Sequence, residues 1–353
     1  MKSKRKKIII SISCFALILV FLVLPFVISI AIYNSNFGNR YETISWMARS
    51  IEEFDGLKAE QNMFGSNKNQ LLAGYTYYKE GIDPKGVIII AHGLGGGGQN
   101  HYMDVADYFT TNGYLVFAYD ATGNDKSEGD CVEGIPQGEI DLDHAIRFIK
   151  ECKKFEGMPI MLFGHSWGAY SVGSVLNLHP DIKSIVMIAG FNKSIDIIEE
   201  EGKRIAGDGI SLLLPYISAI EKIKFGSYAG YNCIEGINKS GAGAMIIHSE
   251  DDKMVSFENQ YLSFYKEFKD NSKVRFVKYE DRGHDYVYYT DASRQYKNKL
   301  NKEFKAYVDS LDTELTPEIK TEYMNKHLDK KQLFELDNEL MSQIVSFYDS
   351  YSK

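Results

Sequence analysis

A serine between two glycines is the residue in this chain best suited to carry out chemistry. Ser166 lies in the run GHSWG at 164–168, between an apolar segment at 160–163 and a helical pattern at 167–178. A tight strand-to-helix turn needs glycine on both sides of the serine, because a side chain there would collide with neighbouring elements. The run therefore predicts a nucleophilic serine held in a strained turn.

The partners that a serine nucleophile needs follow it in the chain. A serine hydroxyl attacks a carbonyl only when a base takes its proton and an acid orients that base. The adjoining acids 250–252 follow the apolar segment 244–247, and His284 follows the next such segment, 274–279. The order serine, acid, histidine predicts a catalytic triad, although charge alone does not choose among the three acids.

A tetrahedral intermediate also needs hydrogen-bond donors for its negative oxygen. Typical donors are the amide that follows the nucleophile and an amide from a loop after an early strand. In this chain these are the backbone groups of Trp167 and Leu94, the latter in the glycine-rich loop 93–98. Glycines in that loop let the backbone approach a substrate closely.

Elements that would position these residues alternate regularly from Lys85 onward. Strands alternating with helices predict an α/β fold, with a mostly parallel sheet that carries helices on both faces and catalytic groups at the carboxyl ends of its strands. The expected strands are 87–91, 115–119, 160–163, 185–189, 244–247 and 274–279, and the expected helices are 100–111, 138–154, 167–178 and 256–269.

Two segments depart from this alternation. Residues 57–79 alternate loosely around 65–69, as a β-hairpin would. Residues 191–243 interrupt the pattern and predict an insertion above the sheet, a cap. Its apolar patch at 210–217 suits an acyl chain, or equally helices packed on the sheet.

Several of these stretches resemble the α/β-hydrolase superfamily. The run HSEDDKMV at 248–255 resembles the pattern H-G-x-x-D-x-x-V, which aligns the catalytic acid with Asp252 and leaves Asp251 as the alternative. Ser249 departs from the pattern, in which glycine is usual. The pair Gly283-His284 resembles the family's G-H motif and supports His284 as the base.

The glycine-rich loop narrows the resemblance. The run HGLG at 92–95 resembles the H-G-x-G segment of monoacylglycerol lipases and related bacterial lysophospholipases and serine aminopeptidases. The resemblance covers about 57–190 and 244–285. It implies that Leu94 supplies the second oxyanion amide and that His92 braces the loop. It also implies a carboxylic ester hydrolase, with a serine aminopeptidase or amidase as the alternative.

The amino-terminal segment predicts a membrane anchor. Five basic residues within positions 2–7 precede an uncharged apolar run at 8–33, which as a helix would be about 39 Å long, enough to cross a bilayer. Because this positive cluster exceeds the two arginines at 40 and 49, we expect a cytoplasmic amino terminus and an extracytoplasmic catalytic domain at the cell membrane. The resulting division is a basic tail (1–7), a transmembrane anchor (8–33), a juxtamembrane linker with an amphipathic helix at 40–55 (34–56), and a hydrolase domain (57–353) with a cap insertion at about 191–243.

The composition of the chain bears on nucleic acids, metals and cofactors as possible partners. The chain carries a net charge of −8, and because the basic tail contributes +5, the remainder carries −13, which argues against a nucleic-acid partner. The four cysteines have no spacing that suits a zinc site, and no metal or cofactor is implied. The sequence leaves the oligomeric state open.

Two interpretations outside the serine hydrolases compete with this one. The loop 93–98 also fits G-x-G-x-x-G after a strand, with Asp120 placed as a ribose-binding acid would be, which is typical of dinucleotide-dependent oxidoreductases. That interpretation leaves the serine turn and His284 unexplained. The other is a hydrolase-like binding protein without activity, against which the intact serine, acid and histidine argue.

Overall fold

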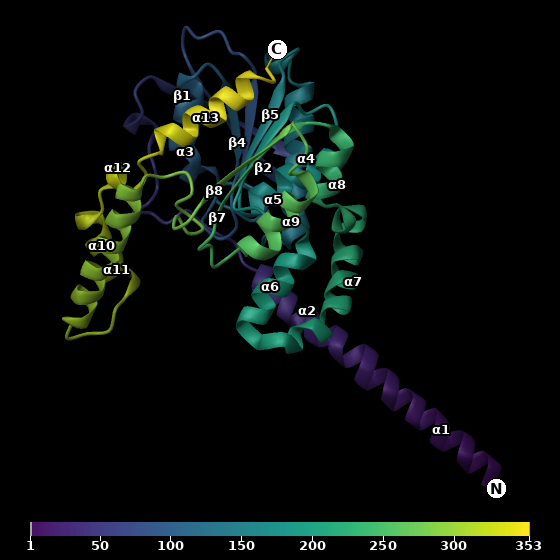
Figure 1. Cartoon of the computed structure of the whole chain (residues 1–353). Coiled ribbons are helices and arrows are strands. Elements are labelled where there is room, and N and C mark those ends of the chain that lie inside the picture. Colours follow the sequence, from purple (N-terminus) through teal and green to yellow (C-terminus); the bar gives the residue numbers. More distant parts are fainter. Residues whose placement is uncertain (1, 353) are drawn as a thin grey trace.

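The computed structural model describes residues 2–352, except for the side chains of residues 2, 3, 14–16 and 18. Within these residues, eight strands form one sheet in the order β1-β2-β4-β3-β5-β6-β7-β8 (Figure 1). β2 pairs antiparallel with β1 and β4, and the six strands from β4 to β8 in this order are parallel. The strands are β1 Leu57–Gly65, β2 Leu71–Lys79, β3 Val87–Ala91, β4 Leu115–Tyr119, β5 Ile160–His165, β6 Ser184–Ile188, β7 Gly243–Ser249 and β8 Val274–Tyr279.

Helices cover both faces of the sheet, as the alternating pattern predicted. Ile89 packs in one apolar cluster, whereas its neighbours Ile88 and Ile90 pack in the other, because successive strand residues point to opposite faces. The first cluster includes residues of α4 Ile135–Glu151, α5 Trp167–Ser174, α8 Cys233–Ser240 and α9 Leu262–Phe268, and the second includes residues of α3 Met103–Thr111 and α13 Asn338–Asp349. The central strands are therefore buried on both sides, which explains their continuous apolar runs.

The insertion between β6 and β7 is only in part a cap. Its helices α6 Ser194–Ala206 and α7 Leu214–Phe225 project beyond the sheet (Figure 1). In contrast, α8 packs on α5, where the Cys233 thiol lies 3.3 Å from the Tyr170 carbonyl oxygen. The cap predicted over 191–243 is therefore shorter, because the last helix of the insertion belongs to the layer that covers the sheet.

Part of the apolar patch of the insertion packs on other helices, whereas Leu212 is exposed. Ile210 is buried against Gly202 of α6. Ile217 is buried in a cluster with Tyr33 of the amino-terminal helix, and Leu213 packs on the same cluster. These residues therefore pack within the cap and on the amino-terminal helix, and not on the sheet.

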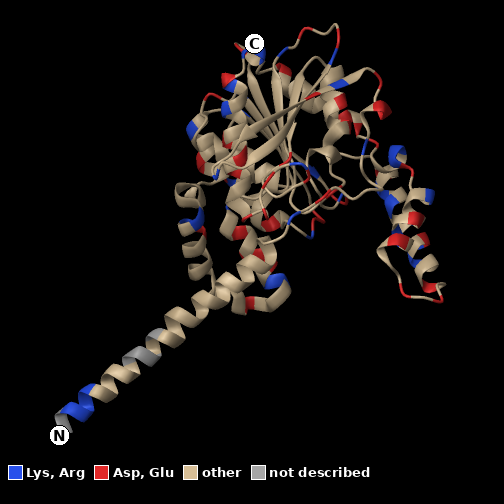
Figure 2. Ribbon diagram, turned by 180° about the vertical axis from the view of Figure 1, so that it is seen from behind, with Lys and Arg blue, Asp and Glu red and all other residues tan. Residues whose placement is uncertain are grey.

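One long helical segment extends from the body at the amino terminus. It consists of α1 Lys2–Ile18, a π-helical stretch Leu19–Val23 and α2 Leu24–Phe37. Among the described residues, Leu19–Phe37 is the stretch that is long and apolar enough to cross a membrane, with a mean hydropathy of 1.9, and a signal sequence would have the same properties. Figure 2 shows Lys and Arg grouped at the amino-terminal end of α1 and an uncharged helix after them.

The amphipathic helix predicted over residues 40–55 is wrong. This segment is extended and turned, with one short 3-10 helix at Ile51–Glu53. Its backbone donors bind the body: the Tyr41 N–H donates to the Gly123 carbonyl, and the Arg49 N–H donates to Asn100 Oδ1. The apolar spacing that suggested a helix instead places Met47, Ile51 and Phe54 against the second core cluster, so tertiary contacts override the local periodicity.

The chain beyond β8 closes the fold and adds a projecting hairpin. α10 Asp291–Asp309 and α11 Pro317–His327 form the hairpin, which lies away from the sheet in Figure 1. The short α12 Lys330–Leu333 leads into α13, in which Leu340, Ile344 and Phe347 are buried.

Candidate active site

Ser166 occupies the turn between β5 and α5 in a backbone conformation that side chains rarely adopt. Its φ is 56° and its ψ is −115°. A Cβ at Gly164 would lie 2.2 Å from the Gly168 carbonyl oxygen, and one at Gly168 would lie 1.9 Å from the Ala91 oxygen. Both flanking glycines are therefore sterically required, and the strained turn exposes the serine hydroxyl at the carboxyl end of β5.

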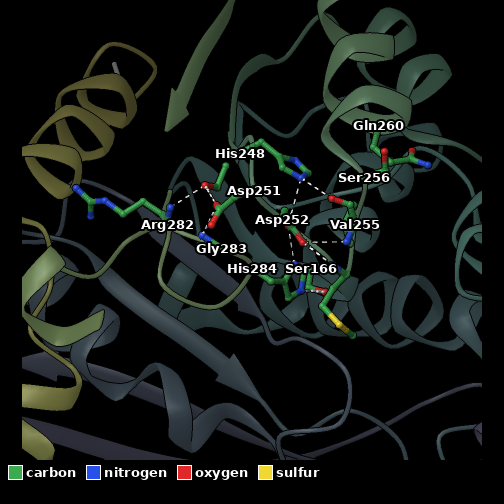
Figure 3. A network of polar contacts seen from close by, with 12 residues as sticks. Ser166, His248, Asp251, Asp252, Val255, Ser256, Gln260, Arg282, Gly283 and His284 are labelled. Atoms are coloured by element: carbon green, nitrogen blue, oxygen red, sulfur yellow. Dashed lines mark hydrogen bonds and ion pairs between the residues drawn. The ribbon is translucent and has the colours of Figure 1, made fainter. Parts of the chain in front are cut away.

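The three residues predicted as a triad form one chain of hydrogen bonds (Figure 3). His284 Nε2 lies 2.8 Å from Ser166 Oγ, and His284 Nδ1 lies 2.8 Å from Asp252 Oδ2. A carboxylate can only accept, so Nδ1 carries the proton and Nε2 is left to accept from the serine hydroxyl. This tautomer is the one in which an imidazole can act as a base toward serine.

The Asp252 carboxylate is held in its charged form by donors from two directions. Burial by itself would raise its pKa, but hydrogen bonds from His248 and His284 outweigh burial and hold the pKa well below its usual range. Oδ1 also accepts from the Met254 and Val255 amides at 2.8 and 3.0 Å. The acid is thus a fixed anion at neutral pH.

His248 is a site residue to which the sequence analysis gave no role. Its Nε2 lies 3.0 Å from the Val255 carbonyl oxygen and 3.3 Å from Asp252 Oδ2, so one N–H is shared between the two acceptors. It stands four residues before Asp252 in the run that resembles the family pattern, and this position was the available signal. His248 orients the carboxylate that orients His284.

Asp251, the alternative acid, contacts the loop that carries the base. Its Oδ1 accepts from the Gly283 N–H at 2.7 Å and from the Ser249 hydroxyl at 2.6 Å. Ser249 Oγ in turn accepts from the Arg282 N–H at 2.8 Å. The serine at the position where glycine is usual therefore ties the acid loop to the histidine loop, and Asp251 lies beside the base without binding its ring.

The two predicted oxyanion amides belong to the turns that follow β5 and β3. Trp167 is the first residue of α5, so its amide has no acceptor within the helix. Leu94 follows β3 in the glycine loop, which His92 holds in place: the Ala121 N–H donates to His92 Nε2 at 2.9 Å, and Nδ1 donates to the Gly93 carbonyl at 2.7 Å. Burial lowers the pKa of His92 to about 4, so this brace is uncharged at neutral pH.

A second hydrogen-bonded chain connects the oxyanion loop to the base. The Gly93 N–H donates to the Tyr102 hydroxyl at 3.0 Å, and this hydroxyl lies 3.2 Å from His165 Nδ1. His165 Nε2 lies 3.0 Å from the His284 carbonyl oxygen. Burial, together with the nearby His284 ring, lowers the pKa of His165 to about 4. Neutral His165 thus donates to His284 and accepts from Tyr102, and the loops on both sides of Ser166 are joined.

We expect Tyr102→Phe to lower kcat by roughly tenfold to hundredfold while KM changes little, because the Gly93 amide and His165 each lose a partner and the oxyanion loop loosens. Steady-state kinetics with a chromogenic ester measures the effect. Tyr108→Phe, in the helix α3 that begins directly after Tyr102, is the matched control. A Tyr102→Phe variant with the parent kcat would show that this link does not position the site.

The segment that follows α2 also holds the glycine loop. Asp125 accepts from the Thr43 N–H at 2.5 Å, from the Thr43 hydroxyl at 2.6 Å and from the Gly98 N–H at 2.7 Å. A Cβ at Gly97, whose φ is 91°, would collide with Thr43. The linker between the amino-terminal helix and the body is therefore part of the wall around the oxyanion loop.

Asp120 lacks the freedom that the dinucleotide interpretation requires. It is 1% exposed, and its carboxylate accepts from the Gln99 amide at 2.9 Å and the Lys126 amide at 3.3 Å. A Cβ at Gly98 would lie 1.9 Å from its Oδ1. The acid supports the glycine loop from inside and is not available to a ribose.

One group of side chains has the spacing of a metal site. Ligand atoms of His165, His284 and Asp285 lie within 4.8 Å of one another. Both ring nitrogens of His284 are engaged with Asp252 and Ser166, however, and both nitrogens of His165 have the partners given above. The cluster is satisfied by hydrogen bonds and offers a metal no free imidazole.

Part of the chain matches a known protein family. A family model described as serine aminopeptidase S33 matches residues 82–232, a range that contains the glycine loop and the serine turn. The chain resembles this family over somewhat less than half of its length, and its fold is that of an α/β-hydrolase. Two relatives of this α/β-hydrolase are a monoglyceride lipase homolog of monkeypox virus, 30% identical over 93 residues, and the human monoglyceride lipase, 29% identical over 93 residues. Each match covers 26% of this chain and about a third of the relative, 33% and 30% respectively.

Solved structures show the same fold. This α/β-hydrolase is similar to an esterase of Pyrococcus furiosus, with a TM-score of 0.55 and 16% identity, over 77% of this chain and 97% of the esterase. It is also similar to Est1E of Butyrivibrio proteoclasticus, with a TM-score of 0.50 and 16% identity, over 71% and 99% of the two chains. The eight-stranded, mostly parallel sheet expected from the sequence is thus that of an α/β-hydrolase.

Proposed function

We propose that this chain is a membrane-anchored serine hydrolase that cleaves carboxylic esters through an acyl-enzyme. The observation that carries the proposal is the continuous hydrogen-bonded chain from Ser166 Oγ through His284 to Asp252. Esterases and monoglyceride lipases among the similar proteins support esters as the substrate class.

In the proposed mechanism, His284 Nε2 takes the proton of Ser166 as the hydroxyl oxygen attacks the ester carbonyl. The amides of Leu94 and Trp167 stabilise the oxyanion, and Asp252 stabilises the imidazolium. The imidazolium then gives its proton to the departing alcohol, leaving an acyl-serine. Water, deprotonated by His284, attacks the acyl carbon, and the acid leaves as the serine recovers its proton.

The anchor and its orientation belong to the same proposal. The apolar helix and the basic cluster before it support a single-pass protein with a cytoplasmic amino terminus and an extracytoplasmic catalytic domain. We place the anchor at residues 8–33, the linker at 34–56 and the hydrolase domain at 57–353. A substrate of small ester or acyl type would then be met at the outer surface of the membrane.

Labelling with a fluorophosphonate, followed by mass spectrometry of the full chain in detergent, tests the serine. We expect the label on Ser166, because a fluorophosphonate reacts with serines that a base activates. A folded sample that is labelled elsewhere, or not at all, would contradict the proposal and favour a hydrolase-like binding protein.

The substrate class needs a separate comparison. The match to the serine aminopeptidase model favours amide hydrolysis as the second candidate. Rates on p-nitrophenyl esters and on aminoacyl p-nitroanilides distinguish the two. We expect the specificity constant to be higher for the esters than for the anilides at equal acyl size, and the reverse would identify an aminopeptidase or amidase.

A further inference from the structure

The last turns of the apolar helix pack on the cap. Tyr33 is 2% exposed, and its hydroxyl donates to Glu221 of α7 at 3.1 Å. The Ser194 hydroxyl of α6 donates to the same carboxylate at 2.6 Å. Farther toward the amino terminus, the Tyr216 hydroxyl of α7 donates to the Phe21 carbonyl oxygen. The amino-terminal helix therefore contacts α7 at both Phe21 and Tyr33, and in Figure 1 α2 passes obliquely beside the lower end of α7.

Because the cap contacts the helix from Phe21 onward, only the part of the helix before Phe21 can be surrounded entirely by lipid. The apolar run begins at Ile8, directly after Lys7, and Phe21 is about 20 Å farther along a helix with a rise of 1.5 Å per residue. The hydrocarbon core of a bilayer is about 30 Å thick. If the charged end stays at the inner boundary, Phe21 lies about 10 Å short of the outer boundary, and tilting the helix moves it deeper.

Side chains at this end of the cap suit such a position. Leu212 and Ile205, at the junction of α6 and α7, are 78% and 71% exposed. Lys203 and Arg204 stand beside Ile205, and their long side chains can place charge at head groups while their stems stay in apolar surroundings. Ile223 is similarly exposed, at 75%, but it lies near the carboxyl end of α7, farther from the cap tip than Glu221, which binds Tyr33.

We infer that the cap tip, residues 205–216, is a second membrane contact whose partner is the acyl-chain region of the outer leaflet. The contact is continuous with the anchor because Tyr216 and Phe21 are bonded. This inference rests on the proposed anchoring. It fixes the rotation of the body about the anchor and brings the cap, which adjoins the carboxyl ends of the strands, down onto the bilayer.

Tryptophan fluorescence in brominated lipid tests the depth of the tip. The full chain carrying Leu212→Trp or Ile223→Trp is reconstituted in phosphatidylcholine and phosphatidylglycerol vesicles with bromine on the acyl chains. Trp46 and Trp167 give the same background in both variants. We expect the added emission of Leu212→Trp to be mostly quenched and that of Ile223→Trp to be unquenched. Equal fluorophosphonate labelling of both variants and the parent establishes that the fold is intact.

The other outcomes distinguish failure of the proposed cap contact from failure of the proposed membrane anchoring. If the chain floats with vesicles and resists alkaline extraction, but neither tryptophan is quenched, the anchor stands and the cap contact is overturned. Equal quenching at both positions would overturn the depth derived from the Phe21 contact. If the chain does not float with vesicles at all, the proposed anchoring fails, and the cap contact fails with it.

Discussion

Ser166→Ala is expected to lower kcat for ester hydrolysis by a factor on the order of 10⁵ to 10⁶, the loss found when a triad serine is removed from a serine hydrolase. Without Oγ, no atom in the strained turn can attack the carbonyl or receive the acyl group. The oxyanion amides and the binding surface remain, so we expect a small residual rate above that of water. Initial rates on a p-nitrophenyl ester with purified full-length protein measure the loss.

Ser171→Ala is the control for this variant. Ser171 is a buried serine one turn farther along α5, where its hydroxyl donates to the Trp167 carbonyl at 2.9 Å. Removing that local bond should leave kcat within about threefold of the parent, because a neutral hydrogen bond contributes about 1 kcal/mol to stability and this one does not touch the reacting atoms. Equal losses in the two variants would mean that Ser166 acts through folding, which would exclude it as the nucleophile.

Asp252→Asn should have the second largest effect, a loss in kcat of about 10⁴-fold. Asparagine can place its amide toward His284 Nδ1, which stabilises the tautomer with the proton on Nε2. That tautomer cannot accept the Ser166 proton, and the imidazolium formed during attack would lose its counter-ion. Comparison of kcat between the variant and the parent across pH 6 to 10 measures the loss.

Asp251→Asn is the matched variant, because it makes the same change one residue away. Asp251 binds the Gly283 amide and the Ser249 hydroxyl, not the imidazole, so we expect a loss of less than about tenfold from a loosened histidine loop. If Asp251→Asn were the more damaging change, the roles of the two acids would have to be exchanged.

The contacts of the linker suggest how anchoring and catalysis are connected in this molecule. Tyr33 packs on the cap, and Thr43 binds the acid that holds the Gly98 amide. The segment between them therefore contacts the cap and the oxyanion loop within about ten residues. A soluble form that begins at residue 34 would lose the Tyr33 contact and leave the Glu221 carboxylate without one of its two hydroxyl donors.

Local patterns were sufficient for much of the fold. The buried parallel strands are continuous apolar runs, and helices with one apolar face lie between them, so that both kinds of element can be recognised from short windows. The serine turn is equally local, because its glycines are required by atoms within the turn and the adjoining strand. The serine, the acid and the histidine each follow a strand of the parallel sheet. Because these strands all end at the same edge, the three side chains can be expected to meet there.

Contacts between distant segments decided the rest. Residues 40–55 have the spacing of a helix, but their amides bind Gly123 and Asn100 from elsewhere in the chain. The role of Tyr102 depends on where its hydroxyl meets His165, which lies in a distant segment, whereas His248 contacts Asp252 from four residues away in the same run. By itself, the sequence determined the strands and helices of the parallel sheet and the candidate nucleophile, base and acid, because these depend on local periodicity and chain order. Only the tertiary structure decided what links the oxyanion loop to the base and where the anchor meets the cap, because those interactions form between segments that folding alone brings together.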